Sequence, residues 1–152
     1  MKSPVKILLS IAMSAIAVCA AHAELKWTED LDAALAGAKN SGKTVLVDFT
    51  GSDWCGYCIK LDEEVLSKDA FKEWAEKDLI LVVLDYPRKK EQSAELKARN
   101  KALREKYEVP GYPTVIMLNG DGKILHTEVG FEPGSGAQWL DTMKKAVAGA
   151  AG

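Results

Sequence analysis

Two cysteines separated by two residues, Cys55 and Cys58, are the residues of the sequence best suited to chemistry. They follow an apolar run and stand at the head of a segment with helical periodicity. At a helix N-terminus, free backbone N–H groups and the helix dipole favour a thiolate, so we expect a lowered pKa for Cys55. One helical turn places the two Cα atoms about 5 to 6 Å apart, which a disulfide tolerates. The pair therefore suits reversible exchange, with Cys55 attacking a disulfide and Cys58 resolving the mixed disulfide.

Two other uses of the pair stay open. A permanent bridge over so short a loop would remove little entropy from the unfolded chain. A zinc or copper site would need more ligands, and beyond residue 23 the sequence has one histidine, His126, on an expected strand. Met117 and Met143 lie on apolar faces that suit core packing. The c-type haem motif needs histidine where Ile59 stands, so we expect no cofactor and no metal.

Residues 1–23 differ in kind from the rest of the chain. Two lysines precede an apolar run at residues 7–21, and Ala21-His22-Ala23 fits the small-x-small rule of a signal peptidase site. The run is too short for a confident membrane span. We expect residues 1–23 to be a cleaved signal peptide and residues 24–152 to be one exported, periplasmic domain. A retained anchor and lipidation at Cys19 are the alternatives.

The expected mature chain is mildly acidic, with 18 basic and 22 acidic residues between positions 24 and 152. This balance gives no electrostatic footprint for nucleic acid. The basic cluster Arg88-Lys89-Lys90 precedes Glu91 and is interpreted as the solvated approach to a helix. Cleavage would leave Cys55 and Cys58 as the only cysteines, too few for a scaffold held by several disulfides.

Helical and strand patterns alternate around the cysteine pair. In chain order we expect a helix capped by Thr28 and ended by Gly42, a buried strand at 44–50, a helix at 55–66 that buries Ile59, Leu61 and Val65, a short helix capped by Ser67 and Asp69, a buried strand at 79–84, an amphipathic helix at 91–107, a strand at 114–118, a hairpin returning over 123–129, and a last helix before a frayed tail from Ala148. This order, βαβ and then ββα, predicts an α/β fold with a central mixed sheet flanked by helices on both faces.

Three separated motifs resemble the thioredoxin superfamily: Val47-Asp48-Phe49, Trp54-Cys55-Gly56-Tyr57-Cys58 and Tyr112-Pro113-Thr114. The resemblance covers roughly residues 27–148 and is closest to exported bacterial thioredoxin-like proteins. The Gly-Tyr pair between the cysteines resembles that of a periplasmic disulfide isomerase. The resemblance implies the thioredoxin fold.

The resemblance also implies roles for the residues of the cysteine motif. Cys55 would be the exposed nucleophile and Cys58 the more buried resolving thiol. Trp54 would pack beside the pair, and Gly56 and Tyr57 would contact the substrate.

Further roles follow for residues outside that motif. Pro113 would be the cis-proline that faces the disulfide, and Tyr112 would offer backbone groups to an extended substrate segment. Asp48 would be the buried acid that assists proton movement at the resolving cysteine, and an ionisable group in a buried strand is costly without a role. The chain departs from the pattern at Thr50–Asp53, which is one residue longer than in ordinary thioredoxin.

We therefore predict an exported thiol-disulfide oxidoreductase that exchanges its dithiol with cysteine pairs of client proteins, as a reductant or isomerase. A membrane electron donor is an expected second partner, and a monomer is expected. Isomerases of the Gly-Tyr type also carry a dimerisation domain, for which residues 24–152 leave no room, so a reductant is favoured. The alternative is a non-catalytic thioredoxin-fold module that binds clients or acts as a chaperone.

Overall fold

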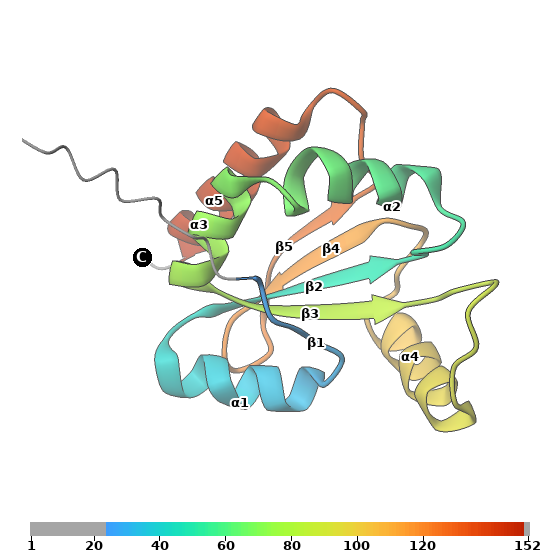
Figure 1. Ribbon diagram of the computed structural model, residues 1–152. Coiled ribbons are helices and arrows are strands. Elements are labelled where there is room, and N and C mark those ends of the chain that lie inside the picture. Colours follow the sequence, from blue (N-terminus) through green and yellow to red (C-terminus); the bar gives the residue numbers. More distant parts are fainter. Residues whose placement is uncertain (1–23, 151–152) are drawn as a thin grey trace, which may run out of the picture.

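The computed structural model describes residues 24–150, and the expected signal peptide at residues 1–23 lies outside this part. The described residues form one five-stranded sheet with helices around it (Figure 1). The strands are β1 (Trp27–Thr28), β2 (Thr44–Thr50), β3 (Leu79–Asp85), β4 (Thr114–Leu118) and β5 (Ile124–Val129). The helices are α1 (Leu31–Ser41), α2 (Gly56–Leu61), the π-helical η1 (Asp62–Leu66), α3 (Asp69–Asp78), α4 (Ala94–Lys106) and α5 (Gly136–Ala150).

The sheet is mixed, with strand order β1-β3-β2-β4-β5. β1 and β2 run parallel to β3, whereas β4 is antiparallel to both β2 and β5. Every residue of the central strand β2 is buried, as its nearly unbroken apolar sequence predicts. In the parallel register Thr50 lies opposite Asp85, so β2 and β3 finish at the same end of the sheet. The loops that follow these two strands therefore meet there.

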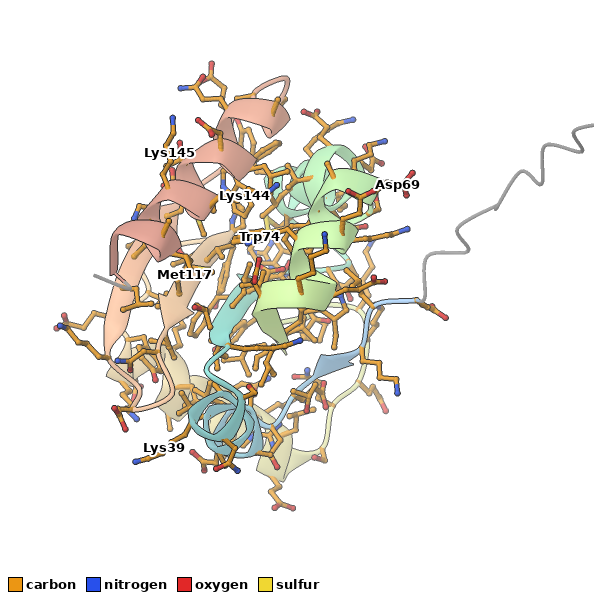
Figure 2. All side chains as sticks on the ribbon, turned by 90° about the vertical axis from the view of Figure 1, so that its left-hand side faces the viewer. Lys39, Asp69, Trp74, Met117, Lys144 and Lys145 are labelled. Atoms are coloured by element: carbon orange, nitrogen blue, oxygen red, sulfur yellow. A yellow bond between two sulfur atoms is a disulfide. The ribbon has the colours of Figure 1, made fainter. Side chains whose placement is uncertain are left out.

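Two separate cores cover the two faces of the sheet, which confirms the predicted layers (Figure 1). One core lies under η1, α3 and α5 and contains Phe71, Met117 and Met143. The other lies between the sheet and α1 and contains Ala34, Phe49 and Ile116. Figure 2 views the molecule from the end away from the loops after β2 and β3, where Lys144 of α5 reaches over Trp74 of α3, 5.8 Å from the ring centroid.

The start of the first helix differs from the prediction. Thr28 lies in β1, a two-residue strand that was not expected. The cap of α1 is Asp30, whose carboxylate accepts a hydrogen bond from the N–H of Ala33 at 2.9 Å. The two residues of β1 form a strand because they pair with β3. A strand this short has no alternating sequence pattern from which it could be predicted.

The helix expected at 55–66 changes form halfway, from α2 to the π-helical η1. Leu61 and Val65 are buried as predicted, but the prediction for Ile59 was wrong, because its residue surface is 41% exposed. Cys58 occupies the core-facing position one residue earlier, and an adjacent residue on a helix points about 100° away. The hydroxyl of Ser67 donates to the carbonyl of Asp62, so it closes η1 rather than capping α3.

The remaining elements follow the sequence prediction with small changes. α4 begins after Ser93, whose hydroxyl accepts a hydrogen bond from the N–H of Leu96 at 3.1 Å. Its one buried residue is Asn100, which periodicity did not single out. The β4-β5 hairpin is confirmed, and α5 continues to Ala150 instead of fraying from Ala148. None of the helices between residues 24 and 150 has the length and apolar character needed to span a membrane.

Candidate active site

The cysteine pair lies where the chain leaves β2 and starts α2. Cys55 is the N-cap residue of α2, and it forms a disulfide with Cys58 across a Cα separation of 5.2 Å. The backbone N–H of Cys58 donates a hydrogen bond to the Sγ of Cys55 at 3.2 Å. A helix-end amide therefore points at the sulfur that the sequence marks as nucleophile, an arrangement that favours negative charge on it.

Exposure around the pair differs from what the resemblance implies. In the disulfide form Cys55 and Cys58 are equally exposed, at 5% each, so the expected difference between them is not seen. Tyr57 between them is 59% exposed. A Cβ at Gly56 would meet no atom within 4 Å, so the space in front of this residue is open. The approach to the disulfide thus runs over an exposed aromatic ring and an open glycine.

Asp48 is a buried acid in the middle of β2. Its Oδ1 has no hydrogen-bond partner in the structure. Burial raises the pKa of this carboxyl from 3.8 to about 7, and the nearby charges of Asp62 and Asp85 act in the same direction. The group can therefore gain or lose a proton near neutral pH.

A cavity of about 500 Å³ connects Asp48 with Cys58. Both Asp48 and Cys58 line it, together with Thr50, Ile59 and Asp62. The extra residue between Asp48 and Cys55 therefore does not move Asp48 away from the cysteine pair, since Asp48 and Cys58 line the same cavity. A cavity of this size has room for water, and the side chains of Asp48, Thr50 and Asp62 provide polar partners for it, so water there could carry a proton between the two groups.

The peptide bond between Tyr112 and Pro113 is cis, as the resemblance implies. The Tyr112 ring meets Trp54 edge to face at 5.8 Å and lies 5.1 Å from the ring of Tyr86. The proline loop is thereby held against the residue that precedes Cys55. Trp54 contacts this loop, a role that adds to its expected position beside the cysteines.

A set of hydrogen bonds that the sequence did not predict joins the loop before Cys55 to segment 86–93, which links β3 to α4. The carboxylate of Asp53 accepts hydrogen bonds from the backbone N–H groups of Arg88, Lys89 and Lys90 at 2.8 to 2.9 Å. The hydrogen bond from Arg88 is the main reason why the pKa of Asp53 is lowered below 3.8. The segment Thr50–Asp53, which is one residue longer than in ordinary thioredoxin, is therefore held by hydrogen bonds to residues 88–90.

Neighbouring residues strengthen the same connection. The indole N–H of Trp54 donates to the carbonyl of Tyr86 at 2.8 Å, and the guanidinium of Arg88 lies 3.7 Å from the centroid of the Trp54 ring. The hydroxyl of Ser52 donates to the carboxylate of Asp85 at 2.6 Å. The partners are 32 to 34 residues apart in sequence, so local patterns could not reveal them.

Within residues 24–150, no group of three or more His, Cys, Asp or Glu side chains is arranged to hold a metal ion. His126 lies on β5 and contacts Glu128, with 3.0 Å between Nε2 and Oε2.

Comparisons with known proteins agree with this fold and site. The profile of the thioredoxin-like domain family matches residues 31–146. The chain is 38% identical over 127 residues to the disulfide bond reductase DsbH of Chlamydia pneumoniae, covering 84% of this chain and 75% of that protein. A solved structure of a DsbH oxidoreductase superimposes with a TM-score of 0.75 at 32% identity, covering 96% of this chain and 95% of the other. A thioredoxin from Thermus thermophilus, 23% identical, shares the fold with a TM-score of 0.61 over 81% of this chain and 87% of its own.

The chain therefore belongs to the thioredoxin-like family and has the thioredoxin fold. Its disulfide pair and its homology to DsbH make it a thiol-disulfide oxidoreductase.

Proposed function

We propose that this oxidoreductase reduces disulfides of client proteins outside the cytoplasm. The observation that carries the proposal is the Cys55–Cys58 pair at the start of α2, with a backbone amide donating to the Cys55 sulfur. The name of its relative, disulfide bond reductase, supports the direction of electron flow. The pattern of residues 1–23 supports export.

The chemistry is a two-electron exchange in two steps. The Cys55 thiolate attacks one sulfur of the client disulfide, forms a mixed disulfide and releases the first client sulfur as a thiolate. The Cys58 thiol then loses its proton and attacks the Cys55 sulfur. This step closes the Cys55–Cys58 disulfide and releases the second client sulfur. The client gains two electrons, and a membrane electron donor would restore the dithiol.

Asp48 is proposed to accept the proton of Cys58 in the second step. Its pKa of about 7 and its place in the same cavity as Cys58 support this role. Because the role belongs to the second step, Asp48→Asn should slow resolution of the mixed disulfide about 10²-fold or more and change its formation little. Stopped-flow traces of the two steps measure this, and unchanged resolution would remove Asp48 from the mechanism.

The client is proposed to bind as an extended segment beside the disulfide. Tyr112 and Pro113 would offer backbone groups to it, as in strand addition. Trp54, Gly56 and Tyr57 would form the surface that receives the residues around the client cysteine. The exposed ring of Tyr57 and the open space at Gly56 support this arrangement.

Insulin reduction tests the proposed activity. The wild type should turn over with a chemical reductant, Cys55→Ser should lose activity, and Cys58→Ser should accumulate a mixed disulfide with the client. Equal rates for wild type and Cys55→Ser would leave the alternative, a module that binds clients without catalysis.

Equilibration with glutathione tests the direction of electron flow. A reductant should have a reduction potential below about −200 mV, nearer to the roughly −270 mV of thioredoxin than to the roughly −120 mV of the oxidant DsbA. A value close to that of DsbA would make the protein an oxidant and contradict the proposal.

A further inference from the structure

Charge is unevenly distributed along the described chain. Residues 88–106, which we call the basic surface, contain eight basic and three acidic residues. The other residues of the described range 24–150 contain ten basic and nineteen acidic residues. A positive segment is therefore set in an otherwise acidic protein, and the eight basic residues are all exposed.

The basic surface begins and ends beside the candidate active site. Arg88 lies over the ring of Trp54, the residue before Cys55. Arg104 lies 5.5 Å from the centroid of the Tyr112 ring, the residue before the cis-proline. A guanidinium group thus lies over Trp54 and another lies near the ring of Tyr112. The carboxylate of Asp53 accepts hydrogen bonds from the backbone N–H groups of residues 88–90 and so holds the backbone that bears the Arg88 side chain.

The second of these arginines lies in α4, whose basic side chains are all exposed. α4 lies near the end of the sheet at which β2 and β3 end (Figure 1). Lys97, Lys101 and Arg104 follow one another at helical spacing and line a cavity of about 300 Å³ with Tyr86 and Pro87. Lys101 has an exposed ion pair with Glu105 at 3.9 Å, a kind of contact that contributes little.

We infer that the basic surface docks an acidic segment of the client protein next to the disulfide that is to be reduced. This inference rests on the proposed function. The surface adjoins Trp54 and Tyr112, the residues before Cys55 and the cis-proline, which is where a client has to present its disulfide. This position favours a client protein over a lipid headgroup or a nucleic acid as its occupant. Guanidinium groups bind carboxylates with directed hydrogen bonds, and clustered charge speeds the encounter of opposite charges. The acidic remainder of the protein would repel the same segment elsewhere and so orient it.

Three synthetic peptides with one disulfide test the inference. They differ only in the residues that flank the cysteines, which are aspartate, serine or lysine. The measured quantity is the second-order rate constant of their reduction by the reduced protein. At 10 mM salt we expect the aspartate peptide to react at least about tenfold faster than the lysine peptide. The difference should nearly vanish at 1 M salt, where the Debye length falls to about 3 Å.

A charge-reversal variant locates the effect on α4. Lys97→Glu combined with Lys101→Glu should abolish the preference for the aspartate peptide and leave the rate with the serine peptide unchanged. The unchanged rate also shows that the variant is folded. The matched control is Lys144→Glu with Lys145→Glu on α5, at the end of the molecule viewed in Figure 2. It changes the net charge equally and should keep the preference.

The outcomes separate this inference from the proposed function. Equal rates for all three peptides with the wild type would overturn the inference and leave the reductase activity standing. If equal rates came with binding to anionic lipid vesicles that the α4 variant loses, the surface would belong to a membrane. Reduction of no peptide would overturn the proposed function and the inference with it.

Discussion

Asp48 has the least favourable electrostatic surroundings of the residues in the candidate site. Its carboxyl group is buried, has one oxygen without a hydrogen bond, and lies near Asp62 and Asp85. The folded protein holds its proton up to about pH 7, whereas the unfolded chain releases it near 3.8. The folded state therefore binds more protons between these values, and its stability falls as the pH rises through them.

Replacement of Asp48 by asparagine should remove this pH dependence. For the wild type, a pKa of about 7 against 3.8 corresponds to at most about 4 kcal/mol of unfolding free energy, fully present below the lower value and lost by about pH 8. Asp48→Asn should consequently be more stable than the wild type at pH 8, and the gap should narrow at pH 4. Urea denaturation of both proteins at pH 4 and at pH 8 measures this difference in unfolding free energy.

An exposed aspartate provides the control for this experiment. Asp121, whose side chain is 71% exposed, pairs with Lys39 at the surface. Asp121→Asn should follow the wild-type pH dependence of stability. A loss of stability between pH 4 and pH 8 that is as large in Asp48→Asn as in the wild type would contradict the raised pKa.

Cys55 is the second residue whose ionisation depends on its surroundings in the fold. A helix-end amide donates to it, so its thiolate should be favoured and its pKa should lie below the free value of about 8.5. Absorbance titration of Cys58→Ser, in which Cys55 is the only thiol left after the expected cleavage, measures this pKa. A midpoint at or above the free value would show that the helix end does not activate the sulfur.

At the scale of elements, the loop between β2 and α2 depends on a close fit between Gly51 and Trp54. A Cβ at position 51 would lie 2.5 to 2.8 Å from three atoms of the indole ring. The ring cannot move away freely, because it donates to Tyr86 and carries the Arg88 guanidinium. The loop therefore requires glycine at this position.

Gly51→Ala should push the indole out of place and destabilise the protein by about 1 to 3 kcal/mol. It should also slow the reduction of insulin, because Trp54 and the proline loop are held together through the same ring. Urea denaturation and insulin turnover measure the two effects. Gly111→Ala is the matched control, since a Cβ there meets no atom within 4 Å. Equal stability of the two variants would show that the loop accommodates the methyl group.

The elements differ in how far the sequence could predict them. β2, β3 and the β4-β5 hairpin follow from apolar runs and a turn signal, which are local patterns. β1 is too short to have a pattern. Ile59 was misplaced because Cys58 and Ile59 are adjacent apolar residues, and the sequence does not show which of the two faces the core. The cysteine pair and the proline were found as motifs. Asp53 was missed, because its partners are 35 to 37 residues away and their backbone groups leave no mark on the sequence.

At the scale of the whole molecule, the sheet divides the protein into two cores and carries the redox pair at one end. The opposite end is closed where the turn after β4 meets the C-terminal part of α1. Gly120 of this turn lies against the backbone of Lys39, whose side chain is labelled in Figure 2. A Cβ on Gly120 would lie 2.5 Å from the backbone nitrogen of Lys39. Backbone cannot turn aside as a side chain can, so the contact is a rigid one.

Gly120→Ala should therefore force α1 and the hairpin apart and destabilise the protein by about 1 to 3 kcal/mol, measured by urea denaturation. The pKa of the Cys55 thiol should not change, because α2 and its amide are built from the other end of the sheet. Gly149→Ala, in α5 with no atom within 4 Å of the added Cβ, is the control and should be neutral or stabilising by up to about 1 kcal/mol. A shifted thiol pKa in Gly120→Ala would mean that packing at the far end reaches the site. An unchanged pKa of the Cys55 thiol in Gly120→Ala would show that the start of α2 alone sets the reactivity of the sulfur.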